Sequence, residues 1–255
     1  DVGSFNLQIT ISDYMKIKNA KYIYSNSFIE TAKIEAVNYI NGVNDINVQL
    51  SGRFLEILLN DRVINNTQNL NNTTENNCRN LVNNFAIKPS VSSRKIPKVR
   101  LGEAHGLGKK YIMQVTGEEL MTELYTLAKQ DELSIRLRYD FVNDEIIFEV
   151  WQGLDRTDKQ TTNTFAIFSR NFENILDDNY SMDSTKQKNF AYVYGEGEGE
   201  QRFLIEVDNT NGEERKELYV DARDLQQDDM TLNEYKDALR NRGIEKLNEC
   251  NKVET

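Results

Sequence analysis

The chain has 255 residues, a formal net charge of −10 and 38% hydrophobic residues. This length is enough for one large domain or two ordinary ones, and the regular spacing of the apolar residues is typical of a folded protein. The acidic balance argues against direct nucleic-acid recognition, because such proteins carry a basic stripe and the densest basic stretch here, Arg94 to Arg100, is too short to provide one.

An antiparallel sheet is predicted for the first fifty residues. Apolar and polar residues alternate over 4–11, which is typical of a half-buried strand. Further strands are predicted over 21–24, 28–40 and 45–51, with a hairpin signal at Asn41-Gly42 between the last two. Residues 52–59 are predicted to close this sheet as a short helix.

A helix-plus-hairpin α/β unit is predicted for the middle of the chain. Residues 65–77 are rich in Asn and Thr and are predicted to form a surface loop or linker. A helix is predicted over 74–85, because its apolar residues recur at the spacing of one buried helix face. Thr116 and Glu119 have the spacing of a capping box, which predicts the start of a second helix, and the alternation over 133–151 predicts a hairpin packed under it.

The segment that follows residue 151 begins as a polar loop. A short strand is predicted over 165–168, and Phe172, Ile175 and Leu176 are predicted to be core residues. Trp151, the only tryptophan, is predicted to be a core or interface residue, with stacking on a sugar as the alternative.

The C-terminal third is predicted to contain a second sheet and a long helix. A strand over 216–221 is predicted to pair with 202–207 across the Asn-Gly turn at 211–212. A capping box at 231–234 predicts the start of the helix, which is expected to kink or break near Gly243, because glycine weakens a helix by about 1 kcal/mol relative to alanine. Its predicted buried residues are Leu232, Tyr235, Leu239 and Leu247.

Between the strands of this second sheet, Gly195, Gly197 and Gly199 alternate with Glu196, Glu198 and Glu200. A glycine-rich turn can hold a phosphate group, but three carboxylates repel an anion. We therefore predict a β-hairpin tip that faces solvent, with contact to another subunit or to a cation as the alternative.

No catalytic, cofactor-binding or metal-ligating residue is predicted. His105 is the only histidine and Cys78 and Cys250 are the only cysteines, which is too few for a zinc site. His105 is predicted to be an exposed loop residue, and both cysteines are predicted to be buried helix residues without a disulfide. Asp177, Asp178 and Asp183 do not have the spacing of a calcium-binding loop.

No membrane span and no secretory signal are predicted, because no apolar run approaches the roughly 20 residues that cross a bilayer. The chain starts at Asp1, directly before an alternating strand pattern, and stops at Thr255, just after a helical pattern. These two ends predict a fragment of a longer folded protein.

Nine segments occur in a characteristic order along the chain. They are GSFNLQI from Gly3, SGRFLEILLNDRVI from Ser51, RKIPKVRLGEAHGLG from Arg94, YIMQVTGEELMTEL from Tyr111, IIFEVWQGLDRT from Ile146, FSRNFENIL from Phe168, FAYVYGEGEGEQR from Phe190, ELYVDARDL from Glu217 and LRNRGIEKLNE from Leu239. Over essentially the whole chain, this order resembles the ReqiPepy-type siphophage tail protein family. The similarity lies in structural patterns and not in an active-site motif.

The resemblance implies a component of a phage or prophage tail tip that is related to baseplate hub proteins. In such hubs, β-barrel-like domains assemble around the tail axis, commonly as a trimer whose paired domains form a pseudo-sixfold ring. The implied partners are other tail proteins and further copies of the chain, as a homotrimer in the intact assembly. The implied location is the virion tail, assembled in the cytoplasm of a bacterial host.

We therefore predict an α+β fold that is mainly antiparallel β. Residues 1–65 and 185–255 are predicted to form one discontinuous hub-type domain, incomplete in this chain, with an α/β domain over 66–184 inserted between them. The predicted function is structural, without enzymatic activity or cofactor. The alternatives are a tail-associated cell-wall hydrolase with a carboxylate pair as acid and base, and a carbohydrate-binding module that reads the host surface through Trp151.

Overall fold

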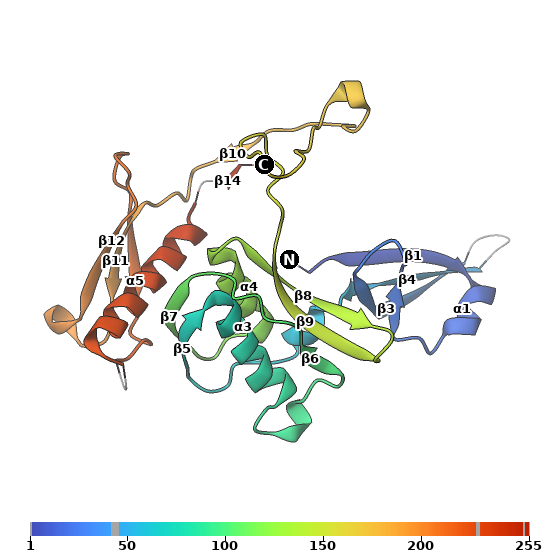
Figure 1. The fold of residues 1–255 in the computed structure, drawn as a ribbon, viewed down its shortest axis with the longest axis horizontal. Helices are drawn as coiled ribbons and strands as arrows, with labels where there is room; N and C mark the ends of the chain where they lie inside the picture. The colour runs from blue at the N-terminus through green and yellow to red at the C-terminus, as the bar shows by residue number, and fades with distance from the viewer. Residues whose placement is uncertain (1, 42–45, 228–229, 252, 255) are drawn as a thin grey trace. The chain divides into compact units, whose positions relative to one another are not determined.

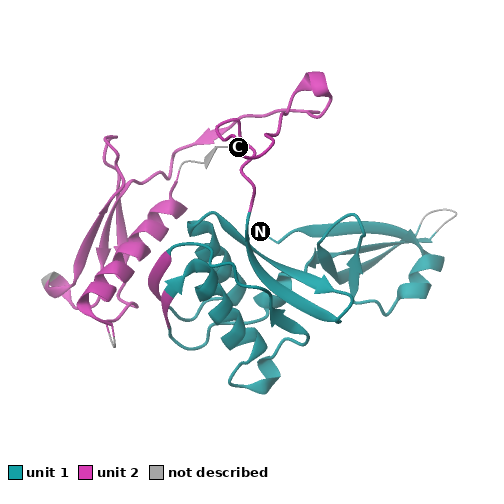
Figure 2. Ribbon diagram, viewed as in Figure 1, with its two compact units in different colours: residues 1–68, 72–109, 115–152 teal, residues 69–71, 110–114, 153–255 magenta. Residues whose placement is uncertain are grey.

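The computed structural model describes residues 2–41, 46–227, 230–251 and 253–254 (Figure 1). It confirms the predicted α+β fold with mostly antiparallel strands. The chain divides into two compact units, of which unit 1 comprises residues 1–68, 72–109 and 115–152 and unit 2 comprises residues 69–71, 110–114 and 153–255 (Figure 2). The grouping of residues 1–65 with 185–255 in one hub-type domain stays a prediction.

The N-terminal part of unit 1 is a four-stranded antiparallel sheet. Its strands are β1 (Ser4–Thr10), β2 (Tyr22–Tyr24), β3 (Thr31–Asn41) and β4 (Ile46–Phe54), in the order β1-β4-β3-β2. Val48 and Leu50 of β4 are fully buried, and their partners across the sheet are Ile9 and Leu7 of β1. Because directly opposed residues of antiparallel strands share a face, these four side chains form the apolar face of the sheet.

The predicted strands of this sheet are confirmed, but its two ends differ from the prediction. Ile11 does not continue β1 and instead begins helix α1 (Ile11–Ile17), whose first turn is capped by the Thr10 side chain. At the other end, β4 continues to Phe54, and the predicted helix is reduced to the single turn α2 (Ile57–Asn60). In the predicted turn, Asn41 ends β3 and Gly42 lies outside the described residues.

The remainder of unit 1 contains the predicted hairpin and two helices. Strands β8 (Leu133–Asp140) and β9 (Glu145–Gln152) form the hairpin, and β6 (Val99–Leu101) pairs with β9 in parallel. Helix α3 (Thr74–Val82), continued by a π-helical turn (Asn83–Ile87), packs on helix α4 (Leu120–Gln130). The predicted helix faces are confirmed, because Cys78, Leu81, Val82, Phe85, Leu120, Leu124, Leu127 and Ala128 are all buried.

Two local predictions in this region are wrong. Part of the predicted loop over 65–77 is the strand β5 (Gln68–Thr73), which pairs with β7 (Lys110–Val115). Thr116 does not cap a helix, because α4 begins at Leu120 after Glu119 without a side-chain cap. The backbone just before α4 is held extended, since Glu119 forms a bridge with Val63 and the amide of Leu120 donates to the carbonyl of Arg62.

Unit 2 is a three-stranded sheet covered by one long helix, with two further strands. Its strands are β11 (Phe190–Tyr194), β12 (Leu204–Asp208) and β13 (Glu217–Asp221), in the order β12-β11-β13, and its helix is α5 (Leu232–Glu249). Separately, β10 (Met182–Asp183) pairs with β14 (Val253–Glu254). The predicted pairing of β13 with β12 is wrong, because β13 pairs in parallel with the other edge of β11 and buries Val220 beside Val193.

Helix α5 is uninterrupted, so the predicted break near Gly243 is wrong. A Cβ atom on Gly243 would lie 2.7 Å from a methyl carbon of Val193 and 2.7 Å from a methyl carbon of Val207. Glycine is therefore required there by the close approach of the helix to the sheet. The capping box of Thr231 and Glu234 is confirmed. Of the predicted buried residues, Tyr235, Leu239 and Leu247 are buried, whereas Leu232 is 47% exposed.

Residues from the middle of the chain complete unit 2. The Asn241 side chain of α5 donates to the carbonyl of Ile112 in β7 at 2.8 Å, and the Asn71 side chain of β5 donates to Glu234 at 3.0 Å. These bonds attach parts of β5 and β7 to the helix. Among the helices of the described residues, none combines the length and the apolar character that crossing a membrane would need.

Candidate functional site

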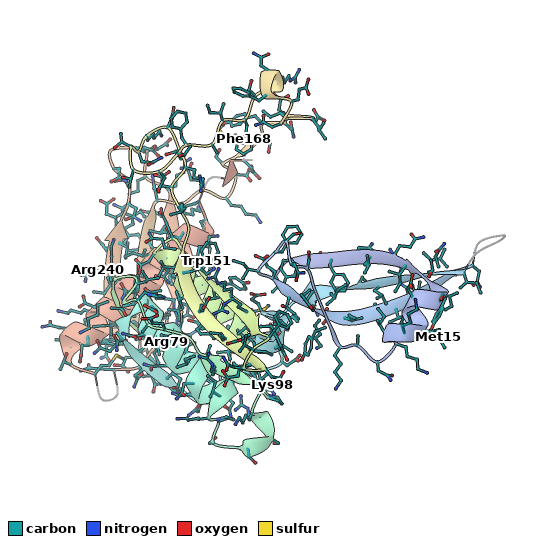
Figure 3. The ribbon with its side chains drawn as sticks, turned by 45° about the vertical axis from the view of Figure 1, so that its right-hand side comes forward. Met15, Arg79, Lys98, Trp151, Phe168 and Arg240 are labelled. Carbon is teal, nitrogen blue, oxygen red and sulfur yellow. The ribbon has the colours of Figure 1, made fainter. Side chains whose placement is uncertain are left out.

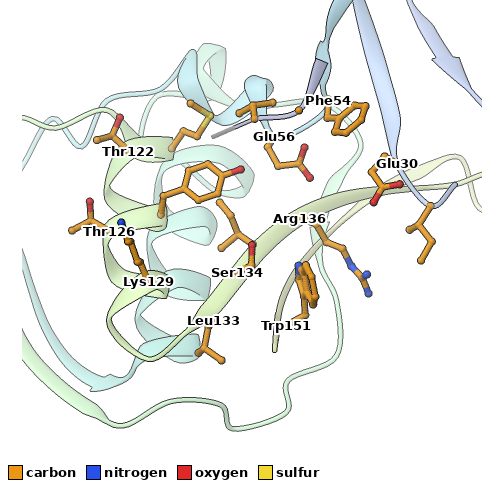
Figure 4. A pocket seen from close by; sticks show the side chains of 16 residues that line it. Glu30, Phe54, Glu56, Thr122, Thr126, Lys129, Leu133, Ser134, Arg136 and Trp151 are labelled. Atoms are coloured by element: carbon orange, nitrogen blue, oxygen red, sulfur yellow. The ribbon is translucent and has the colours of Figure 1, made fainter. Parts of the chain in front are cut away.

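Unit 1 contains a hollow with a volume of about 900 Å³ (Figure 4). It lies between helix α4, strand β8 and the segments at the start of β1 and β3. Its lining residues are Val2, Gly3, Ile29, Glu30, Phe54, Glu56, Met121, Thr122, Tyr125, Thr126, Lys129, Leu133, Ser134, Ile135, Arg136 and Trp151. The volume is within the range of pockets that bury a small ligand, and the lining mixes apolar and charged groups.

Glu56 is the most deeply buried charged residue of this hollow. It is 7% exposed, and its carboxylate accepts the backbone N–H of Leu137 at 2.8 Å. Burial raises the pKa of Glu56, with a smaller contribution from the nearby charge of Glu30. Burial, together with the charge of Glu56, also raises the pKa of Tyr125 to about 12. At neutral pH the hollow therefore presents a protonated Tyr125 hydroxyl that can donate a hydrogen bond.

Trp151 lies at the rim of the hollow and is 38% exposed. The guanidinium carbon of Arg136 lies 5.5 Å from the centroid of its ring, which is within the range of a cation–π contact. Arg136 is held there by Glu149, whose carboxylate accepts from its Nε at 2.7 Å and from Arg138 at 3.0 Å. The structure thus places Trp151 where an aromatic side chain can contact a ligand or a partner.

The residues considered for nucleophilic and metal chemistry do not meet at this hollow. His105 is exposed in a loop, as predicted, and its backbone N–H donates to the carboxylate of Glu75. Cys78 is buried, which raises its pKa, Cys250 is half-buried, and both are free thiols. Within the part of the chain that the structure describes, no group of three or more His, Cys, Asp or Glu side chains could hold a metal ion.

Three of the four basic side chains between Arg94 and Arg100 are paired with groups of their own unit. The Lys98 ammonium lies 2.6 Å from the carboxylate of Asp144, and Arg100 forms an ion pair with Glu145. Arg94 donates to the Asn65 side chain and to the carbonyl of Val63. These positive charges are therefore paired with acceptor groups of unit 1 itself.

The first residues of the glycine–glutamate turn of unit 2 are hydrogen-bonded to helix α5. The hydroxyl of Tyr235 accepts the N–H of Glu196 at 2.9 Å and donates to the carbonyl of Leu225 at 3.3 Å. A Cβ atom on Gly195 would lie 2.3 Å from this hydroxyl, so Gly195 is required by a close approach. Glu198 farther along the turn is exposed.

A second candidate surface is the segment 159–176 of unit 2, which we call the arm. The predicted strand over 165–168 is absent, and the predicted core residues Phe172 and Leu176 are 65% and 102% exposed. Side chains project outward from this segment, as Phe168 shows (Figure 3). The prediction failed because apolar residues were assigned to a core without a helix or strand period to support it.

The solved structures that the chain resembles include three phage tail proteins, and the first of these has a TM-score above 0.5. The tail protein from Neisseria meningitidis MC58 is 13% identical with a TM-score of 0.52, and the match covers 98% of this chain and 68% of that one. Prophage tail protein gp18 from Listeria monocytogenes EGD-e is 11% identical with a TM-score of 0.46, covering 88% and 64%. The 43 kDa tail protein of prophage MuSo2 from Shewanella oneidensis is 16% identical with a TM-score of 0.41, covering 96% and 72%.

No curated protein has a significant sequence match to the chain. The family model described as Siphovirus ReqiPepy6 Gp37-like protein matches residues 1–255. This match confirms the resemblance that the order of the nine segments indicates, and the Neisseria structure shares the fold. The chain therefore belongs to the Siphovirus ReqiPepy6 Gp37-like protein family, a family of phage tail proteins.

Proposed function

We propose that the chain is a structural subunit of a phage or prophage tail tip or baseplate hub, which assembles as a homotrimer around the tail axis and binds other tail proteins. The observation that carries this proposal is the family match over all 255 residues. In the assembled tail, residues 1–65 and 185–255 contribute the hub-type domain, and residues 66–184 form the insertion. The protein acts without catalysis and without nucleic-acid recognition, and it is incorporated into the virion tail in the host cytoplasm.

The exposed surface of the single chain supports an assembly role. The chain exposes 16472 Å². Two separate compact bodies of the sizes of unit 1 and unit 2 would together expose roughly 14,000 Å². The difference of about 2,500 Å² is comparable to the surface that stable protein–protein interfaces bury. A subunit that buries this excess against its neighbours in a ring would account for it.

The first prediction concerns the oligomeric state of the protein in solution. We expect light scattering to give three times the 29.6 kDa mass of one chain. Each chain carries a net charge of −10, so the copies repel one another, and salt screens that repulsion. The trimer should therefore persist to lower protein concentration at about 0.5 M salt than at low salt. A monomer at high protein concentration under both conditions would contradict the proposal.

A second candidate function is binding of a host-surface carbohydrate in the hollow of unit 1. The observation that favours it is the position of Trp151 at the rim, next to Arg136 and to carboxylates that can accept hydrogen bonds from hydroxyl groups. Glu30 is exposed and can act as such an acceptor, and the protonated Tyr125 can act as a donor.

The single tryptophan provides a direct test of this candidate. If the hollow binds cell-wall polysaccharide, titration should quench or shift the Trp151 fluorescence with saturation. Glu30→Gln should weaken the apparent affinity by about fivefold, because the amide keeps an acceptor oxygen but loses the charge that strengthens the hydrogen bond. Glu198→Gln, an exposed residue of unit 2, is the matched control and should have no effect. Release of peptidoglycan fragments that is lost in Glu56→Gln would instead support a hydrolase and contradict a purely structural role.

A further inference from the structure

Two carboxylates of the hollow in unit 1 have no positively charged partner among the described residues. Glu30 and Glu56 both line the hollow, and neither forms an ion pair within the part of the chain that the structure describes. Glu56 is only 7% exposed, and carboxylates this deeply buried are almost always paired. An amide donor such as the N–H of Leu137 does not neutralise its charge. A cationic group of a ligand would supply the missing counter-charge.

The two cations that line the hollow do not neutralise this acidic pair. Arg136 is ion-paired with Glu149, and its Nε lies 2.7 Å from the Glu149 carboxylate. Lys129 lies on helix α4, across the hollow from Glu30 (Figure 4). Burial raises the pKa of Glu56, and the charge of Glu30 raises it more than the charge of Arg136 lowers it. The combined effect of these neighbouring charges at Glu56 is therefore negative, which favours binding of a cation.

The size and the lining of the hollow favour a cationic group on an organic molecule over a metal ion. The volume of about 900 Å³ is within the range of pockets that bury a small ligand. Within the described residues, no group of three or more His, Cys, Asp or Glu side chains could hold a metal ion. The lining includes Thr126 and Ser134, whose hydroxyls can bond to sugar hydroxyls, and Trp151, whose ring can stack on a sugar. An ammonium group on a sugar suits both the charge and the lining.

We propose that the hollow binds a carbohydrate with a free amino group, whose ammonium contacts Glu30 and Glu56 while its ring stacks on Trp151. This ligand class refines the second candidate function and rests on it, because it names the kind of carbohydrate that the hollow selects. An ammonium offers three donors and a full positive charge, so its hydrogen bonds to carboxylates are charge-assisted. The N-acetylated form of the same sugar carries an uncharged amide and would leave the acidic pair without a counter-charge.

Two tetrasaccharides that differ only at the amino group provide the test. The glucosamine tetramer and its fully N-acetylated counterpart have the same backbone. Each is titrated against the Trp151 fluorescence at about pH 6, where amino groups are protonated. We expect the glucosamine tetramer to bind more tightly by about tenfold or more, as hydrogen bonds to charged groups predict. The ratio of the two affinities should shrink at about 0.5 M salt, because salt screens the attraction between the charges.

Glu30→Gln locates the amino group, and Glu103→Gln is the matched control. Both side chains are exposed and both variants lose one negative charge, but Glu103 does not line the hollow. Glu30→Gln should reduce the affinity ratio to about threefold or less, because the charge-assisted hydrogen bond is lost. Glu103→Gln should leave the ratio unchanged, and neither variant should alter the far-UV circular dichroism.

Equal binding of the two tetramers by the wild-type protein would overturn the amine preference and leave the carbohydrate candidate intact. A ratio that Glu30→Gln leaves unchanged would place the amino group elsewhere and overturn the proposal. Failure of both tetramers to bind would overturn the proposal alone if cell-wall polysaccharide still quenches Trp151, and the carbohydrate candidate as well if it does not. The trimer proposal is unaffected by each of these results.

Discussion

Replacement of Gly243 by valine is expected to destabilise unit 2 by about 3 kcal/mol or more, as overpacking in a closely packed core does. The Cβ atom alone would lie 2.7 Å from methyl carbons of Val193 and Val207, which belong to paired strands and cannot move apart without opening the sheet. Gly243→Ala gains about 1 kcal/mol of helix propensity but meets the same contact, so we expect a smaller net loss. Trp151 lies in unit 1, so its fluorescence does not report the unfolding of unit 2. Urea unfolding should therefore be followed by circular dichroism and by hydrogen exchange of α5.

Arg240→Val is the matched control for this prediction. Arg240 lies on the exposed side of the same helix and pairs with Asp237 at 2.7 Å. Its replacement introduces the same β-branched residue without a steric conflict, so the loss should stay below about 1 kcal/mol. Equal stability of Gly243→Val and Arg240→Val would show that the helix does not approach the sheet as closely as the structure indicates.

Replacement of Glu75 by alanine is expected to destabilise unit 1 by about 2–3 kcal/mol, because hydrogen bonds to a buried charged group are lost. Glu75 is fully buried at the start of α3, and its carboxylate accepts the N–H of His105 at 3.0 Å and the N–H of Leu107 at 2.8 Å. These bonds anchor the loop that carries His105. Glu75→Ala should also increase cleavage of this loop in limited proteolysis. The stability of unit 1 can be measured from the change in Trp151 fluorescence on unfolding.

Glu103→Ala is the control for the loop, since Glu103 is an exposed acidic residue of the same segment. We expect a change within about 0.5 kcal/mol, as for other surface substitutions. Glu75→Gln keeps the size of the side chain and one acceptor oxygen. The stability of this variant should therefore lie between those of Glu75→Ala and Glu103→Ala. A Glu75→Ala protein as stable as the Glu103→Ala protein would mean that the loop amides are as well satisfied by water as by the carboxylate.

The hollow and the arm show how far the candidate sites could be predicted. Trp151 is recognisable from the sequence as a residue with two interpretations, and the structure places it at a rim where both remain testable. Glu56 and Tyr125 could not be singled out, because the 41 Asp and Glu residues are equivalent to one another, as are the 12 Tyr residues, until burial distinguishes one of them. The apolar residues of the arm can be read from the sequence. Their exposure could not be predicted, because no local pattern shows whether another helix or sheet packs over them.

Features that depend on neighbours along the chain can be predicted from the sequence alone. The strand alternation of the N-terminal sheet, the buried faces of α3 and α4, the capping box at Thr231 and the family all follow from local order and spacing. The folded structure was needed to identify the partner of β13, the role of Gly243 and the acceptor role of Glu75. Each of these depends on atoms that are distant in sequence, because strand pairing, close packing and burial arise only when separate segments meet in space.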